Sequence, residues 1–331
     1  MECPKCAAEA PDGFKFCESC GAKLSAQTEP TAETREGPAG CPCGAGPTEV
    51  DPQGFCTGCG KKRVTETRRH LEIVLSASLA GVTDIGKRHP TNQDDLAVAT
   101  VEAEGEDAVI IVVCDGVSSA QNAEAASAIG AKIACDLLQE AARKQNVDLN
   151  AAMSAAILAA HHAVCTLPYL SGAPKDPPAA TIVATLVRGR TATIGWLGDS
   201  RAYWFGANGG AQLTRDHSWV NEVVDAGECT EAEALNSPLA HAITRCLGVM
   251  EGESPDEAPK IGILTFPLIS PGHLLLCTDG LWNYAPETEQ IGALLHSENS
   301  AEDCLLAARR LIAFANAQGG RDNITAAVYR V

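Results

Sequence analysis

Two apolar runs that each end in Asp-Gly most constrain how this chain can fold. The run 109–114 leads into Asp115, and the run Leu274 to Leu276 leads through Cys277 and Thr278 into Asp279. A short run rich in Val, Ile and Leu, closed by a Gly that permits a tight turn, predicts a strand covered on both faces. Each strand therefore brings a carboxylate to its exit, at a mouth of the core that water and ions can reach.

A third acidic residue stands in a similar place. Asp322 comes just before the last apolar stretch, 324–331. Carboxylates at three strand edges could converge on hard cations, which prefer oxygen ligands. The alternative is that each Asp only caps a turn, as Asp commonly does.

Six short segments occur in an order and spacing typical of one enzyme family. They are VVCDGVSS (112–119), LGDSRAY (197–203), TRDHS (214–218), ITRCLG (243–248), LCTDGLW (276–282) and GGRDNIT (319–325). Together they resemble the metal-dependent Ser/Thr protein phosphatases of the 2C type, over residues 80–331. The resemblance implies an α/β four-layer sandwich, in which two mainly antiparallel sheets are flanked by helices. Periodicity alone predicts only a mixture of helices and strands.

The resemblance also implies which residues hold metal ions. Asp115 is expected to bridge two cations, one of which the Gly116 carbonyl also binds. Asp279 and Asp322 are expected to bind the other cation, and Asp94 to hold a metal-bound water. The lack of His among these ligands favours Mn²⁺ or Mg²⁺ over zinc. The expected reaction is hydrolysis of phosphoserine or phosphothreonine by in-line attack of a metal-bridging water, without a protein nucleophile.

Phosphate binding and a third metal ion involve further residues. Counting from Gly86, the position of the family Arg that binds the substrate phosphate is taken by His89, with Arg88 next to it. Either side chain could bind phosphate, His89 as a hydrogen-bond donor with a titrating charge. Asp176 and Asp216 match acids that bind a third metal ion in related bacterial enzymes. For Asp216, a helix N-cap is the alternative.

The N-terminal cysteines form close pairs. Eight of the fifteen cysteines lie in the first 59 residues, as Cys3 and Cys6, Cys17 and Cys20, Cys41 and Cys43, and Cys56 and Cys59. This spacing predicts tetrahedral Cys₄ zinc sites, so the segment resembles a double zinc ribbon with two structural zinc ions. Modules this small cannot bury a sufficient core without metal. A redox CxxC motif is the competing interpretation.

Composition divides the chain into five segments. Residues 25–40 are rich in Pro, Thr, Glu and Gly, and residues 61–72 are polar and charged, as is typical of linkers. We expect zinc ribbon 1 at 1–24, a flexible linker at 25–40, zinc ribbon 2 at 41–60, a charged linker at 61–72 and the phosphatase-like domain at 73–331.

Local patterns predict several elements of the larger domain. Residues 71–86 are expected to form one strand, and residues 179–198 two strands joined by a turn. Leu149–Cys165 is expected to be a helix, and Ser118 or Ser119 to cap an Ala-rich helix before it.

Almost all of the net charge of −17 lies in the larger domain. Residues 1–70 hold 9 Lys and Arg against 10 Asp and Glu, whereas residues 71–331 hold 16 against 32. Such an acidic body is a poor binder of phosphate backbones, so a nucleic-acid partner is not expected. The acidic surface could draw cations to a metal site, or could simply aid solubility.

Hydropathy gives no sign of a membrane segment. No run of 18 or more apolar residues is present, and the sequence starts with MECPKC rather than with a signal sequence. We therefore expect no membrane partner and a cytoplasmic location.

Three functions remain open at this point. The first is an active phosphatase that acts on phosphoprotein substrates of a Ser/Thr kinase, with the zinc ribbons recruiting substrate or partners. The second is a phosphoprotein-binding pseudo-phosphatase, weakened by His89 and by the pair Ser118 and Ser119, where relatives commonly have glycines. The third is a zinc-ribbon adaptor that contacts nucleic acid. The complete set of metal carboxylates favours the first, and the acidic body argues against the third.

We predict two bound zinc ions in the first 60 residues, because eight paired cysteines make two Cys₄ sites. Elemental analysis of a fragment spanning residues 1–68 is expected to return about two zinc ions per chain, and the same fragment treated with a chelator is expected to lose its fold. A zinc content well under two would contradict the double ribbon.

Overall fold

The computed structural model describes residues 69–102, 106–248, 258–295 and 303–331. These residues belong to the unit Val64–Val331, and the other unit, Met1–Arg63, lies outside the described residues. The predicted zinc ribbons and the linker between them therefore lie outside as well. Within the described ranges, none of the helices has the length and apolar character needed to cross a membrane.

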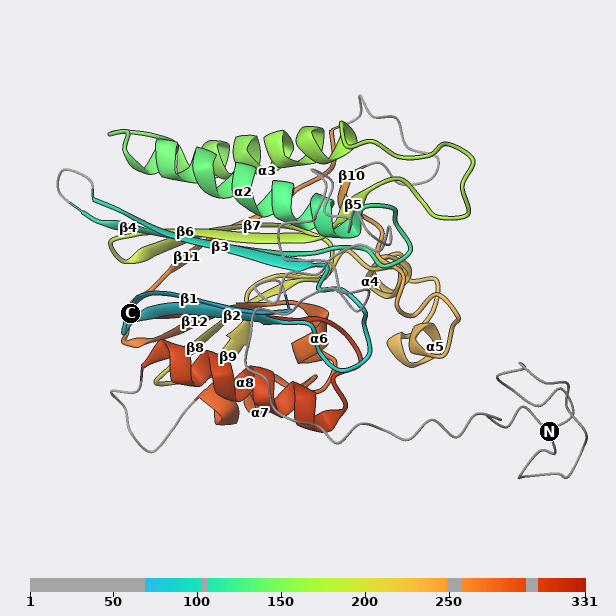
Figure 1. The fold of residues 1–331 in the computed structure, drawn as a ribbon. Helices are drawn as coiled ribbons and strands as arrows, with labels where there is room; N and C mark the ends of the chain where they lie inside the picture. The colour runs from blue at the N-terminus through green and yellow to red at the C-terminus, as the bar shows by residue number, and fades with distance from the viewer. Residues whose placement is uncertain (1–68, 103–105, 249–257, 296–302) are drawn as a thin grey trace, which may run out of the picture. The chain divides into compact units, whose positions relative to one another are not determined.

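Two sheets lie face to face in the larger unit (Figure 1). The six-stranded sheet is built, in order across the sheet, from β1 (His70–Ser76), β2 (Leu79–Asp84), β13 (Ile324–Arg330), β12 (Gly272–Cys277), β8 (Arg201–Gly206) and β9 (Gly209–Gln212). The five-stranded sheet is built from β11 (Gly262–Pro267), β7 (Thr191–Leu197), β6 (Ile182–Arg188), β4 (Ala108–Asp115) and β3 (Asp94–Val101). Across the described part of both sheets, neighbouring strands run antiparallel.

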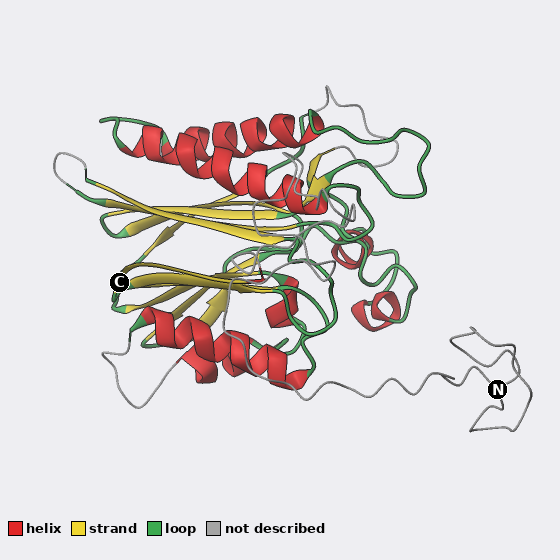
Figure 2. Ribbon diagram, in the orientation of Figure 1, coloured by secondary structure: helices red, strands yellow, loops and turns green. Residues whose placement is uncertain are grey.

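Helices cover the outer face of each sheet, which gives four layers (Figure 2). Helices α2 (Ala123–Ala142) and α3 (Leu149–Cys165) cover the five-stranded sheet, and α7 (Thr288–Leu295) and α8 (Cys304–Gln318) cover the six-stranded sheet. Shorter elements lie near one end of the sandwich, namely β5 (Ala179–Ala180), α4 (Trp219–Asp225), α5 (Glu231–Leu235), β10 (Leu247–Gly248) and α6 (Asp279–Trp282). The four-layer α/β sandwich that the family resemblance implied is confirmed.

Residues 108–114 of strand β4 are all apolar, because both faces of the strand are covered. Ile110 and Val112 pack in the cluster that contains the inward residues of α2 and α3. Ile111 and Val113 pack in the cluster that fills the space between the sheets. Because successive side chains of a strand point to opposite faces, a strand covered on both sides needs apolar residues throughout.

The segment 71–86 forms two strands and not the single strand that we expected. β1 and β2 pair as a tight hairpin, in which the backbone N–H of Ser78 donates to Ser76 Oγ over 3.2 Å. The turn contains Ser rather than Gly or Pro, so the usual signal of a hairpin is missing. β1 also begins at His70, and thus includes the end of the segment 61–72 that we assigned to a linker.

Helix α2 begins later than the sequence suggested. Its N-cap is Asn122, in the left-handed conformation with φ of 51° and without a side-chain cap, so the expected Ser cap is wrong. Ser118 instead donates from its hydroxyl to Gln93 Oε1 over 3.1 Å, within a loop that precedes the helix. Helix α3 spans Leu149–Cys165, as predicted, and strands β6 and β7 confirm the strand pair at 179–198.

Candidate active site

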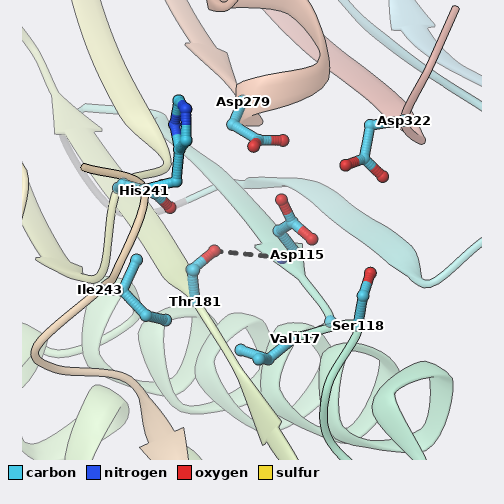
Figure 3. Close-up of a pocket in the computed structure, with 10 residues that line it drawn as sticks. Asp115, Val117, Ser118, Thr181, His241, Ile243, Asp279 and Asp322 are labelled. Carbon is cyan, nitrogen blue, oxygen red and sulfur yellow. Dashed lines mark hydrogen bonds between the residues drawn. The ribbon is translucent and has the colours of Figure 1, made fainter. Parts of the chain in front are cut away.

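Several strand ends meet at one end of the sandwich and carry acidic residues there. β3 starts at Asp94 and β4 ends at Asp115, and these two residues are opposite each other in the antiparallel pair. Asp279 opens helix α6 directly after β12, and Asp322 lies just before β13. Figure 3 shows the side chains of Asp115, Asp279 and Asp322 pointing toward one another. Residues far apart in the sequence are thus gathered at one place.

Three of these carboxylates, but not Asp94, line a pocket of ≈ 230 Å³. Asp115, Gly116, Asp279 and Asp322, all of which the sequence singled out, lie in its wall. Asp199 lines the same pocket. No Lys or Arg is found among its described lining residues, so the pocket is acidic.

The Gly of each Asp-Gly pair permits a close approach of two chain segments. A Cβ placed on Gly280 would lie 1.8 Å from the carbonyl oxygen of Asn323, and one on Gly116 would lie 2.7 Å from that of Gln93. Any larger residue would push the segments apart. These glycines therefore keep the segments that carry the carboxylates in contact.

Asn323 ties together the segments around the pocket. Its side-chain oxygen accepts from the backbone N–H of Gln93 over 2.7 Å. Its amide nitrogen donates to the carbonyls of Ile85, over 2.9 Å, and of Thr91, over 3.1 Å. The side chain is buried, so each of these bonds replaces one that water would otherwise make. The bonds hold the segment before β3 against the residue that follows Asp322.

Asp94 is buried and held by two threonines. Thr278 and Thr325 donate from their hydroxyls to Asp94 Oδ2 over 2.9 and 2.7 Å. Burial raises the pKa of Asp94, and these two hydrogen bonds partly offset the rise. Thr325 also bonds the hydroxyl of Thr83, in the same sheet, over 2.8 Å, and its bond to Asp94 of β3 joins the two sheets at the site.

The carboxylates of the pocket destabilise one another when ionised. Burial raises the pKa of Asp115 well above its usual value, and the charges of Asp94, Asp279, Asp199 and Asp322 raise it further. The pKa values of Asp279 and Asp199 are also raised, first by burial and then by neighbouring carboxylates. A bound cation would offset this repulsion and favour the ionised forms.

The donor set fits hard divalent cations. Asp279 Oδ1 is buried and accepts no hydrogen bond from the described residues, whereas its Oδ2 accepts from Asn283 over 3.1 Å. Carboxylate and carbonyl oxygens are the ligands that Mg²⁺ and Mn²⁺ prefer. In the described part of the chain, no three His, Cys, Asp or Glu side chains form a group that could hold a metal ion by themselves. Water and the Gly116 carbonyl would therefore have to complete the coordination, as is usual for Mg²⁺.

Of the two candidates for phosphate binding, His89 is the one that contacts the site. His89 Nε2 lies 3.2 Å from Asp322 Oδ1. Arg88 is exposed, and neither of the two side chains is among the residues that line the pocket. His89 is therefore the better placed of the two.

The two acids associated with a third metal ion have different surroundings. The guanidinium of Arg201 donates to Asp216 through Nε and Nη2, at distances from 2.7 to 3.1 Å, so an ion pair engages this carboxylate. The N-cap of α4 is Ser218, so the alternative that Asp216 caps this helix is wrong. Asp176 lies in a neighbouring hollow and not in the carboxylate pocket. A third metal ion at these residues stays a prediction.

Sequence reasoning missed the two other titratable residues of the pocket, Asp199 and His241. Asp199 follows the buried strand β7 after a Gly, so the signal that identified Asp115 could have identified it as well. His241 carries no such signal, since it lies in an irregular segment between α5 and β10.

Comparison with known proteins agrees with this geometry. Residues 85–311 match the family model for protein phosphatase 2C, and the chain belongs to this family. Residues 3–24, outside the described part, match a zinc-ribbon domain.

Known relatives are bacterial phosphatases. The serine/threonine phosphatase stp of Listeria welshimeri is 39% identical over 147 residues, which is 44% of this chain and 54% of that protein. The chain thus spans about half the length of the curated relatives that it matches. The S. agalactiae serine/threonine phosphatase is a structural neighbour with a TM-score of 0.60 and 26% identity, covering 78% of this chain and 99% of that one. The catalytic domain of the phosphatase PstP, in complex with two manganese ions, has a TM-score of 0.59 and 25% identity, covering 79% and 99%.

We predict that Asn323→Ala destabilises the protein by about 3 kcal/mol, because it removes the partner of one buried and two part-buried backbone groups. Chemical denaturation measures the free energy of unfolding. The matched control is Asn236→Ala, which removes one bond at an exposed position and is expected to cost about 0.5 kcal/mol or less. Equal stability of the two variants would contradict the role of Asn323.

Proposed function

We propose that this protein is a metal-dependent phosphatase that hydrolyses phosphoserine and phosphothreonine in proteins. The observation that carries the proposal is the pocket in which Asp115, Asp279 and Asp322 face one another, with Asp279 Oδ1 buried and without a hydrogen bond in the described structure. Membership of the protein phosphatase 2C family and the likeness to bacterial Ser/Thr phosphatases support it.

Two divalent cations, Mn²⁺ or Mg²⁺, fit the proposed roles of these residues. Asp115 would contact both cations, and the carbonyl of Gly116 would contact one. Asp279 and Asp322 would bind the other cation. The manganese ions in the PstP structure support the choice of metal. When bound, such cations activate water for in-line attack on phosphorus and neutralise the phosphoryl oxygens.

The chain's own residues would position the reaction. Asp94, fixed by Thr278 and Thr325, is buried beside Asp115 and can accept a proton or hold a water in place. His89 would donate a hydrogen bond to the substrate phosphate, with Arg88 next to it as a second donor. Since the described pocket wall contains no Lys or Arg, the metals would neutralise most of the phosphate charge.

The natural substrate would be a phosphoprotein made by a Ser/Thr kinase. We propose that the N-terminal zinc ribbons recruit this substrate or a partner, because their predicted metal sites are separate from the carboxylate pocket in chemistry and in sequence. The cytoplasmic location expected from the sequence is part of the same proposal.

We predict that hydrolysis of p-nitrophenyl phosphate and of a phosphothreonine peptide requires Mn²⁺ or Mg²⁺ and is abolished by EDTA. Asp279→Asn is expected to lower kcat/KM more than about 100-fold, since even one lost electrostatic contact in a preorganised site costs about that much. The matched control, Asp225→Asn, changes an exposed carboxylate that pairs with Arg215 and is expected to keep full activity.

Calorimetric titration with Mn²⁺ adds a readout that does not depend on turnover. Asp279→Asn is expected to weaken Mn²⁺ binding, while Asp225→Asn leaves it unchanged. Full activity in metal-stripped protein, or in the Asp279→Asn variant, would contradict the two-metal mechanism.

Removal of residues 1–68 is expected to leave hydrolysis of small substrates largely intact. β1 begins at His70, so the truncated chain keeps every strand of the described sheets. Action on a natural phosphoprotein should weaken, because remote contacts that recruit it are lost while the chemistry remains. The measurement is kcat/KM of full-length and truncated protein on both substrates. A folded truncated protein that has lost most activity even on p-nitrophenyl phosphate would show that the ribbons complete or regulate the site.

A further inference from the structure

A second hollow adjoins the carboxylate pocket. It has a volume of ≈ 360 Å³, and its wall includes Val117, His241 and Ile243, which also line the carboxylate pocket. Figure 3 labels these three side chains around the carboxylates. The two hollows therefore adjoin, with these three residues between them.

The floor of the second hollow is apolar. Ala120, Ala179 and Cys246 form a small buried cluster, and the half-buried side chains of Val117 and Ile243 pack against it. The hollow is lined by all five of these residues. Contact with an apolar group would remove more of this surface from water, which is favourable.

Backbone hydrogen bonds hold two walls of the hollow together. The N–H of Val117 donates to the carbonyl of Ala179 over 3.0 Å, and the N–H of Asp176 donates to that of Ser119 over 3.2 Å. Ala179 in turn pairs with Gly248 in the two-stranded sheet of β5 and β10. These two walls are thus tied to regular structure rather than formed by loose loops.

The remaining wall is attached to helix α4. The N–H of Trp219 donates to the carbonyl of Ala242 over 2.9 Å, and Ile243 forms a β-bridge with Ser218. Since bonds of this kind fix all three walls, the hollow is preformed. Preformed apolar cavities of this size are typical of ligand sites.

We propose that this hollow is a substrate subsite that binds an apolar side chain one or two positions from the phosphorylated residue. The inference rests on the proposed phosphatase function and concerns its sequence preference. An extended peptide advances by about 3.3 Å per residue, so a near neighbour of the phosphorylated residue can enter a hollow that shares a wall with the carboxylate pocket. Leu is the expected occupant, because the floor is apolar. Acidic side chains are disfavoured, because exposed Asp176 lies at the edge of the hollow.

The first experiment measures the preference of the full-length protein in Mn²⁺. Phosphothreonine peptides carry Leu, Ala or Asp at each of the two positions before and the two positions after phosphothreonine, one substitution at a time. At one of these positions, Leu is expected to give a kcat/KM at least about tenfold above that of Asp, as is usual for apolar pockets, with Ala in between. p-Nitrophenyl phosphate, which has no peptide, reports the chemistry alone.

The second experiment fills the hollow. Ala242 lines the second hollow but not the carboxylate pocket, so Ala242→Phe is expected to abolish the preference for Leu while hydrolysis of p-nitrophenyl phosphate changes less than about twofold. The matched control is Ala155→Phe, on an exposed position of helix α3, which should keep the preference. Ser119→Asp provides an independent variant if Ala242→Phe does not fold. It places a charge at an exposed position in the lining of the same hollow and is expected to reduce the advantage in kcat/KM of the Leu peptide over the Ala peptide.

Three results would overturn what is proposed here, and they can be told apart. If p-nitrophenyl phosphate is hydrolysed but Leu, Ala and Asp peptides differ by less than about twofold at all four positions, the subsite is refuted and the phosphatase function stands. A Leu preference that persists in both folded Ala242→Phe and Ser119→Asp would place its origin elsewhere and refute the subsite as well. If p-nitrophenyl phosphate and the peptides are all left intact with Mn²⁺ present, the proposed function itself fails.

Discussion

Repulsion among buried carboxylates is the constraint on which the rest of the structure depends. Burial and neighbouring charges raise the pKa values of Asp115, Asp199 and Asp279. Carboxylates that repel one another do not stabilise their own arrangement, so contacts from the surrounding chain must hold them in place. Asn323 and the threonines around Asp94 do so locally, and three apolar clusters supply the stabilisation that offsets the cost.

The packing of the two sheets fixes the positions of these carboxylates. β4 and β12 are buried on both faces, so a shift of either strand along its axis would move apolar side chains out of the clusters on both sides. The carboxylates that follow these strands are therefore fixed relative to each other. The segments between strands and helices, which also shape the second hollow, lie around this fixed centre, and binding residues are often found in such positions.

Contacts among neighbouring side chains also hold the backbone of Asp199 in place. The guanidinium of Arg201, paired with Asp216, lies 3.6 Å from the centroid of the Trp282 ring. The indole N–H of Trp282 donates to the backbone carbonyl of Asp199 over 3.0 Å. Asp216, which the sequence associated with metal binding, is thus linked to the backbone of Asp199. The link runs through its ion pair with Arg201 and the contact of Arg201 with the Trp282 ring.

The sequence by itself determined the buried strands before Asp115 and Asp279 and the helix Leu149–Cys165, because apolar runs, Asp-Gly turns and helical periodicity are local signals. The place of Asp322 before the last apolar stretch raised the possibility that it joins the same pocket, and the family resemblance implied it. The tertiary structure decided that Asp199 and His241 join that pocket and that the second hollow adjoins it. These placements depend on strand pairing and loop packing between residues distant in sequence, and such contacts leave no periodic pattern in the chain.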